Sequence, residues 1–135
     1  MKNLNINIGT KEYSINDDVS RILRVNTTDI NILARFDKAE TELKKIASQY
    51  ENITDITAEV ITELDTKVRE QIDYIFDSKA SEIVFGNINC ASIAGGQPIF
   101  MNFIDAILPV IKNDIVEEQE KSEKKISKYT SQVKK

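Results

Sequence analysis

Two long stretches of this sequence carry apolar residues at three- and four-residue intervals, and this spacing constrains the fold more than any other feature. The first runs from about residue 29 to 50 and the second from about 55 to 76. Residues at these intervals share one face of an α-helix, so each stretch predicts an amphipathic helix about 30 Å long. The apolar positions are Leu33, Phe36, Leu43, Ile46, Ala47 and Tyr50 in the first stretch, and Val60, Ile61, Leu64, Val68, Ile72, Ile75 and Phe76 in the second. The short connector predicts an antiparallel helical hairpin, with Thr28 as the N-cap of its first helix.

Two more helices are expected in the second half of the chain. A short one over residues 78–85 would end at Gly86, which suits a left-handed C-cap. The other spans residues 98–115, because Pro98 is favoured at the first helical position and apolar residues follow it at helical spacing. Pro109 lies inside this segment and removes the hydrogen bond to the carbonyl of Asp105, so a kink or a break is expected there.

The N-terminal residues alternate between polar and apolar side chains, which is the pattern of a half-buried strand. The alternation in Leu4, Ile6 and Ile8 is interrupted at Gly9 and resumes after Lys11, so we predict a β-hairpin over residues 3–16. Two strands alone are marginal in water, and the apolar face of the hairpin must therefore rest on a helix or on a partner. For residues 19–25 the sequence predicts no particular structure.

These elements predict an α+β fold that is predominantly α, with an N-terminal hairpin followed by about four helices, two of them long and antiparallel. We expect one globular domain over residues 1–115, because 135 residues is the length of a single domain. Residues 116–135 are rich in Lys and Glu, and we expect a tail that is mobile alone and helical on a partner. Ile126, Tyr129 and Val133 would then form its apolar stripe.

Composition excludes several classes of function. The chain has no His and a single Cys, so the usual zinc ligand sets cannot be assembled. Residues 1–116 hold twelve Lys or Arg against eighteen Asp or Glu, and this acidic charge disfavours binding to nucleic acid. No apolar run is long enough to cross a membrane, and the first residues do not have the pattern of a secretory signal. We therefore expect no nucleic-acid or membrane partner, and a cytoplasmic location.

No residue pattern predicts catalysis. Gly95 and Gly96 are not followed by the Lys and Ser or Thr of a phosphate-binding loop, so a turn before the last helix is the better interpretation. Asp55, Glu59 and Glu63 lie four residues apart, but a solvated acidic face explains them better than a cation site. Cys90 has no His to activate it. We expect no catalytic residue, no metal and no cofactor, and an enzyme stays an alternative only if a pocket holds a carboxylate with a strongly shifted pKa.

One apolar stripe belongs either to the core or to a binding surface. It comprises Phe85, Ile99, Phe100, Phe103, Ile104 and Ile107. Contact between the last helices is the simpler interpretation. In a protein that holds another chain, however, part of such a stripe stays uncovered until the partner arrives. Five of these residues, namely Phe85, Ile99, Phe100, Phe103 and Ile107, are therefore candidate partner-binding residues together with the three apolar residues of the tail.

The order of these parts resembles the tail assembly chaperones of long-tailed bacteriophages and prophages. The resemblance comprises the segment INIGTKEYSI, the long acidic helices, the EIVFG stop and the IFMNFIDAILPVI helix, and residues 83–111 are its most specific part. It implies a non-catalytic, cytoplasmic protein that binds the tape measure protein, keeps it soluble and supports assembly of the tail tube. It also implies a homo-oligomer that is absent from the mature virion.

In that family a ribosomal frameshift often yields a longer form that recruits the tail tube protein. The final Lys134 and Lys135 are compatible with an adenine-rich slippery codon run, which gives a hypothesis for this chain. The alternative reading of the sequence is a small helical scaffold or regulatory protein that dimerises through its long helical hairpin.

Overall fold

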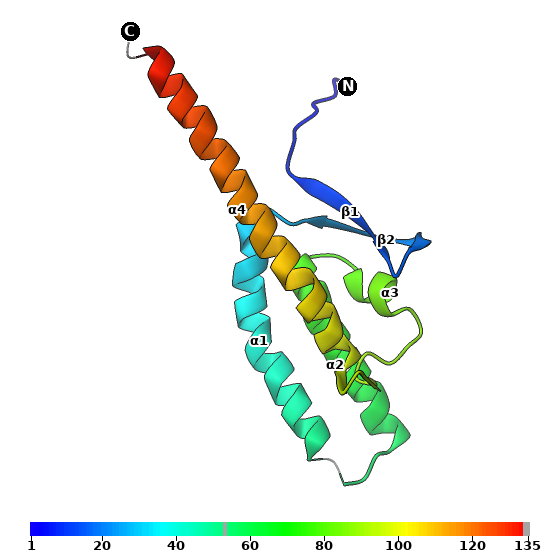
Figure 1. The fold of residues 1–135 in the computed structure, drawn as a ribbon. Helices are drawn as coiled ribbons and strands as arrows, with labels where there is room; N and C mark the ends of the chain where they lie inside the picture. The colour runs from blue at the N-terminus through cyan, green and yellow to red at the C-terminus, as the bar shows by residue number, and fades with distance from the viewer. Residues whose placement is uncertain (53, 134–135) are drawn as a thin grey trace.

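The computed structural model describes residues 1–52 and 54–133, with side chains for all of these except residues 50 and 129–133. The chain forms a two-stranded antiparallel hairpin followed by four helices, which is an α+β fold that is predominantly α (Figure 1). The strands are β1 (Thr10–Ile15) and β2 (Asp18–Asn26). The helices are α1 (Ile30–Glu51), α2 (Ala58–Phe76), α3 (Ala80–Phe85) and α4 (Ile99–Val133). The fold class predicted from the sequence is confirmed.

The two long helices α1 and α2 form the predicted antiparallel hairpin, with α4 lying across them (Figure 1). Helix α2 begins at Ala58, later than expected, because the Thr57 side chain accepts a hydrogen bond from the Val60 backbone N–H as an N-cap. The predicted cap of α1 is wrong by one residue. Asp29 precedes the helix and its carboxylate accepts the N–H of Asn31, whereas Thr28 bonds the side chain of Asn26.

The position predicted for the β-hairpin is wrong. The turn lies at Asn16 and Asp17, whose φ angles of 50° and 62° fit a two-residue hairpin turn. Strand β1 pairs with β2 from Thr10 opposite Asn26 to Ser14 opposite Ile22, and the register then shifts. The pairing partner is therefore the segment for which no structure was predicted. Pairing with β2 is favoured over pairing with residues 1–8 because it buries Leu23 and Val25 in the core. Residues 1–8, which precede β1 in the sequence, are exposed.

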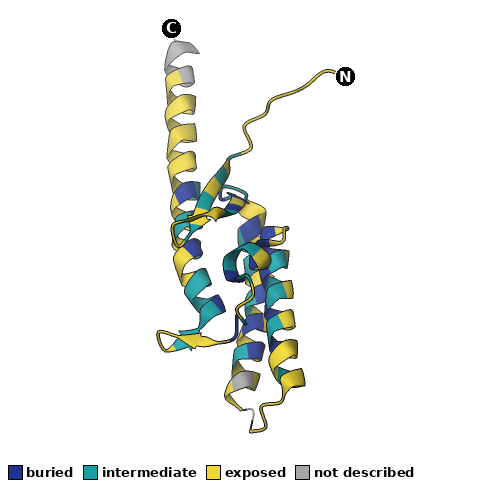
Figure 2. Cartoon of the chain, turned by 90° about the vertical axis from the view of Figure 1, so that its right-hand side faces the viewer, coloured by how far each residue is buried: buried dark blue, intermediate teal, exposed yellow. Residues whose placement is uncertain are grey.

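The hydrophobic core lies between the three long helices and the inner face of the hairpin (Figure 2). Its fully buried side chains include Val68 and Ile72 of α2, Phe100 and Ile111 of α4, and Leu23 of β2. Arg35 of α1 donates through Nε to the carbonyl of Ile75 at 2.8 Å, which joins α1 to the last turn of α2. The side of the α1–α2 pair that faces away from this core is largely polar.

The segment before α4 contains two very short strands, β3 (Ile93–Ala94) and β4 (Gln97–Pro98), which pair with each other. Gly95 and Gly96 form the turn between them with φ angles of 64° and 87°, so the prediction of a turn there is confirmed. Pro98 belongs to β4, and α4 begins one residue later than predicted. Gly86 ends α3 as predicted, and its N–H donates to the carbonyl of Glu82. Its φ of 56° and ψ of −126° lie outside the left-handed helical region, so the predicted left-handed C-cap is wrong.

Helix α4 is much longer than predicted. It does not break at Pro109 and does not end near residue 115, but runs to Val133. Its second half extends beyond the rest of the molecule in both ribbon views (Figures 1 and 2). We call residues 116–133 the stalk. The side chains of residues 116–128 of the stalk are exposed. This part of the helix is therefore stabilised by its own backbone hydrogen bonds and not by packing on the body.

Candidate partner-binding groove

Helix α4 has two apolar faces in its first half. Phe100, Ile104 and Ile111 are buried against the other long helices. The second face carries Ile99, Phe103, Ala106, Ile107 and Val110, whose spacing of three and four residues follows the helical repeat. This second face looks toward the hairpin and α3 and forms one wall of a groove.

The groove holds a cavity of about 350 Å³ between the β1–β2 hairpin, α3 and α4. Its lining consists of Tyr13, Ser14, Ile15, Asn16, Leu23, Val84, Phe85, Ile99, Asn102, Phe103, Ala106, Ile107 and Val110. None of these described lining residues is charged, and most are aliphatic or aromatic. A concave surface of this chemistry suits an apolar side chain of a partner, because polar groups would lose their water there without gaining partners.

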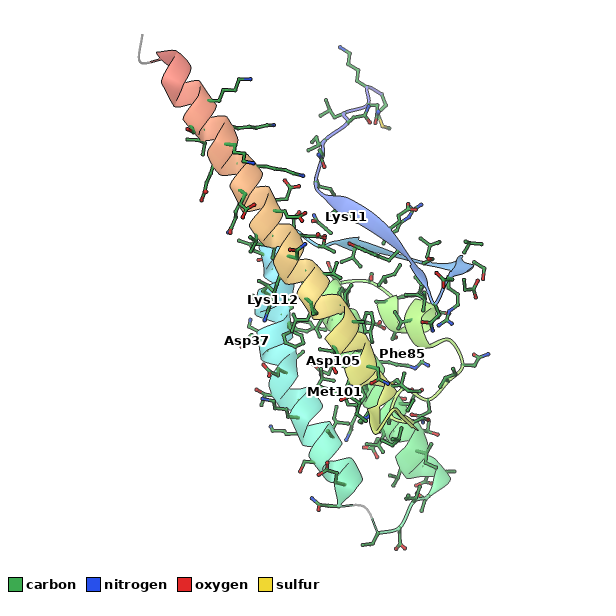
Figure 3. All side chains as sticks on the ribbon, in the orientation of Figure 1. Lys11, Asp37, Phe85, Met101, Asp105 and Lys112 are labelled. Carbon is green, nitrogen blue, oxygen red and sulfur yellow. The ribbon has the colours of Figure 1, made fainter. Side chains whose placement is uncertain are left out.

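Aromatic contacts fix the floor of the groove. The ring of Phe103 lies 5.9 Å from that of Phe85 in an edge-to-face arrangement and 5.6 Å from that of Phe76, which joins α4 to both α3 and α2. The guanidinium of Arg69 lies 5.8 Å from the centre of the Phe85 ring. Figure 3 shows Phe85 beside the part of α4 that carries Asp105. The floor of the groove is therefore built from side chains of α2, α3 and α4 that contact one another.

A polar cluster around Asp114 holds the hairpin over the groove. The Asp114 carboxylate is buried and accepts hydrogen bonds from the hydroxyls of Thr27 at 2.5 Å and Tyr13 at 3.3 Å. It also pairs with the Lys11 ammonium at 3.0 Å. The bond from Thr27 and the nearby Lys11 charge lower the pKa of Asp114 below its ordinary value. We call these four residues the Asp114 latch, since they join β1, the turn between β2 and α1, and the middle of α4.

Two arginines fix the other wall of the groove. Arg21 of β2 donates through Nε to the carbonyl of Ile83 at 2.9 Å and also bonds the carbonyl of Val84, so it satisfies the end of α3. Arg69 of α2 donates to the carbonyls of Gly86 and Ile88 at 2.7 and 2.9 Å. Its Nε also donates to both carboxylate oxygens of Asp65 at 3.0 Å, and the guanidinium donates to the carbonyl of Ser81 at 3.4 Å. The loop that follows α3 is therefore tied to α2.

Asp65 and Cys90 interact next to this loop, outside the groove. The Cys90 N–H donates to Asp65 at 2.9 Å. Burial acts to raise the pKa of Asp65, but bonds from Cys90 and Arg69 outweigh it and the pKa is lowered. Burial, together with the neighbouring carboxylate, raises the pKa of the Cys90 thiol to about 12, so this buried thiol is not a reactive nucleophile.

The structure brings four of the predicted partner-binding residues together. Phe85, Ile99, Phe103 and Ile107 all line the groove. Phe100 does not, because it is one helical step round from Ile99 and lies in the core with 1% of its surface exposed. Ile126 is exposed on the stalk, away from the groove. The side chains of the last two candidates, Tyr129 and Val133, lie outside the described residues.

The part of the groove that the hairpin contributes was not predicted from the sequence. Tyr13, Ile15 and Leu23 line it from β1 and β2, and the misplaced hairpin concealed their role. The signal was present in the dipeptide of Asn16 and Asp17, since both residue types tolerate the positive φ angles that a two-residue hairpin turn needs.

Within residues 1–52 and 54–133, no group of three or more Cys, Asp and Glu side chains is arranged to hold a metal ion. Glu63, one of the three acidic residues considered for a cation site, forms an ion pair with Lys67 at 2.9 Å. None of the described helices combines the length and apolarity needed to span a membrane. No protein-family model, curated protein or solved structure matches this chain.

Proposed function

We propose that this protein is a non-catalytic chaperone that binds apolar segments of a long client chain in the groove between β1, α3 and α4. The observation that carries the proposal is the uncharged lining of the groove, in which Phe103 and Ile107 face a cavity of about 350 Å³. Covering an apolar helical ridge in such a groove removes its surface from water, which contributes roughly 25 cal/mol for each Å².

The client that best fits the resemblance is the tape measure protein of a bacteriophage or prophage tail. A tape measure is a very long chain whose apolar helical ridges would associate with one another before assembly, and a helical chaperone keeps such ridges apart. In this proposal many copies coat one client in the bacterial cytoplasm and leave as the tail tube forms. They are absent from the finished virion, and a frameshifted longer form would recruit the tube protein.

The stalk supplies a second contact in this proposal. Its side chains, where described, are mostly charged, and a helix of that kind is suited to bridging between molecules rather than to packing in a core. Ile126 is the exposed apolar residue in its middle. A client lying along α4 from the groove to the stalk would cover both.

Co-expression with the long helical protein encoded next to this chain tests the proposal. Ala106 is exposed at the groove, and Ala106→Glu places a charge where an apolar client would lie. Ala34→Glu is the matched control, since Ala34 is an exposed helical alanine on α1 outside the groove. We expect the client to be soluble with the native chain and with Ala34→Glu, and insoluble with Ala106→Glu.

Two results would contradict the proposal in different ways. A client that stays insoluble with the native chain argues against chaperone function. A client that is solubilised equally well by Ala106→Glu argues against the groove as its binding site. The genes provide an independent test, because the proposal expects a very long tape measure gene downstream and tube or connector genes upstream.

The scaffold alternative has less support. Dimerisation through the α1–α2 pair needs an apolar outer face, but the exposed positions there include Lys38, Glu42, Lys45 and Glu70. Burying such charges in an interface is costly unless each finds a partner. A transcription or signalling operon around the gene would favour this alternative.

A further inference from the structure

The first eight residues form an exposed arm with one apolar face. They precede β1 and lead away from the body in both ribbon views (Figures 1 and 2). Leu4, Ile6 and Ile8 are 83%, 73% and 61% exposed, and they alternate with asparagines. In an extended chain, residues two apart point to the same side, so the three apolar side chains form one stripe.

The unpaired edge of β1 lies along the groove. Within the described residues β1 pairs only with β2, so its other edge has free backbone N–H and C=O groups. Four consecutive residues, Tyr13 to Asn16, line the cavity. The first three, Tyr13, Ser14 and Ile15, belong to β1. Because successive strand residues point to opposite faces, a cavity that touches three in a row lies beside the edge of the strand.

The arm and the groove match in length and in chemistry. The distance from Leu4 to Ile8 is about 13 Å in an extended strand, and the α4 wall from Ile99 to Val110 is about 16 Å long. The inner face of β1 carries the half-buried Tyr13 and Ile15. An antiparallel arm with Ile6 opposite Tyr13 would place Leu4 opposite Ile15, so both of these apolar side chains would lie over the groove. Ile8 would lie opposite Lys11, beside the groove.

Contacts at Ile8 and Gly9, where the arm joins β1, direct the arm away from the groove of the same chain. The Asn26 side chain donates to the carbonyl of Ile8, and the Gly9 N–H donates to the side chain of Asn7 at 3.0 Å. Gly9 has a φ of 82° and packs so closely that an added Cβ would lie 2.3 Å from the Thr28 hydroxyl. These contacts fix the exit of the arm, and they favour a second copy of the chain as the acceptor.

We propose that the chain forms a dimer by strand exchange, in which the arm of each copy adds to the β1 edge of the other and places Leu4 and Ile6 in its groove. Each β1 edge gains backbone hydrogen bonds from the arm of the other copy. Because both copies use the same two surfaces, the assembly is complete as a two-fold symmetric dimer. The inference goes beyond the proposed function, because the dimer requires no client. It adds that an arm and a client would compete for one groove.

Disulfide cross-linking between two differently tagged variants tests the exchange without any client. One variant carries Asn5→Cys and the other Ser14→Cys, which the proposed register places opposite each other on the solvent side. We expect a cross-linked heterodimer to form at least ~10-fold faster than in a control that pairs Asn5→Cys with Arg24→Cys, because pairing raises the effective thiol concentration. Arg24 is exposed on β2, away from the free edge, and native Cys90 is buried.

The double variant with Asn5→Cys and Ser14→Cys in one chain separates exchange from folding back. Strand exchange predicts interchain disulfides, whereas an intrachain disulfide in a monomer would overturn the proposal. Sedimentation of Ile6→Asp should show loss of the dimer, and Asn5→Asp, on the other face of the arm, should keep it. A native chain that stays monomeric at high concentration would also overturn the proposal, and would leave the co-expression test of client binding unaffected.

Discussion

At the scale of single residues, the Asp114 latch is the contact that most depends on one side chain. Asp114 is the acceptor for Tyr13, Thr27 and Lys11, and it is buried. Removing its charge abolishes the ion pair with Lys11, which is partly exposed and stays hydrated, and replaces a charged acceptor of two hydroxyls by a neutral one. The hydroxyl of Thr27 belongs to a fully buried residue, and a buried donor that loses its acceptor costs more than its bond contributes when made.

We therefore predict that Asp114→Asn lowers the free energy of unfolding by about 1 to 3 kcal/mol. The measurement is chemical denaturation followed by circular dichroism. Glu120→Gln is the control, because Glu120 is an exposed acid on the same helix beyond the latch. A change equal to that of the control would show that the latch does not hold the hairpin.

The same residue predicts a pH dependence. The pKa of Asp114 is lowered from 3.8, chiefly by the hydrogen bond from Thr27. The contribution of Asp114 to the free energy of unfolding is therefore complete above pH 3.8, and it is lost as pH falls through the folded-state pKa. The pKa of Lys11 is raised from 10.5 by its bond with Asp114, so its contribution is complete below 10.5 and is lost as pH rises through the folded-state pKa.

The difference in stability between the native chain and Asp114→Asn should then be constant between about pH 5 and pH 9 and shrink on either side. Denaturation curves of both proteins at a series of pH values would measure it. A difference that grows on acidification would contradict the assignment of the lowered pKa to Asp114.

At the scale of elements, Arg69 is one of the residues that hold the loop between α3 and α4 against α2. This arginine connects α2 to the carbonyls of Gly86 and Ile88 and is held in place by Asp65. Cys90 lies in the same loop, and its thiol is buried with a pKa raised to about 12. The reactivity of that thiol consequently reports on how firmly the loop is held.

We predict that Arg69→Met increases the rate of thiol modification at Cys90 by at least about tenfold, which corresponds to roughly 1.4 kcal/mol of easier local opening. A thiol-reactive chromophore measures the rate, and denaturation on the same sample separates local from global opening. Arg24→Met, which removes an exposed pair with Glu12, is the control and should leave the rate unchanged. An unchanged rate in Arg69→Met would mean that the loop is held by its other contacts.

At the scale of the whole molecule, the body and the stalk differ in what stabilises them. The body has a core shared by three long helices and the hairpin, whereas the described side chains of the stalk beyond Val116 are exposed. We predict that deleting residues 119–135 changes the free energy of unfolding of the body by less than about 0.5 kcal/mol. Chemical denaturation measures this change, and a larger loss would mean that the stalk packs on the body.

The deletion also separates the roles of groove and stalk. If the stalk is a second contact for the client, the shortened chain should keep its stability and its dimer but solubilise less client in the co-expression assay. Equal solubilisation would remove the stalk from the proposed function and leave the groove in it.

Much of the helical framework was predictable from the sequence. The ends of the first long helix, the end of the second at Phe76 and the stop at Gly86 all follow from local patterns. Such patterns are reliable because the apolar repeat and the capping residues act between positions three or four apart. The length of α4 was not predictable, since Pro109 predicts a break and only the packing of Ile104 and Ile111 on the body shows why the helix continues past it.

Local pattern alone therefore determined the fold class, the long helices and the presence of an apolar face on α4. Tertiary structure alone decided which segment pairs with β1, which side of α4 lines a groove and which acidic residue becomes the latch. The physical reason is that these outcomes depend on contacts between residues far apart in sequence. The segment with Leu23 pairs with β1 in preference to the segment with Leu4 because Leu23 is buried against the helices. Asp114 pairs with Lys11 only because α4 crosses the hairpin.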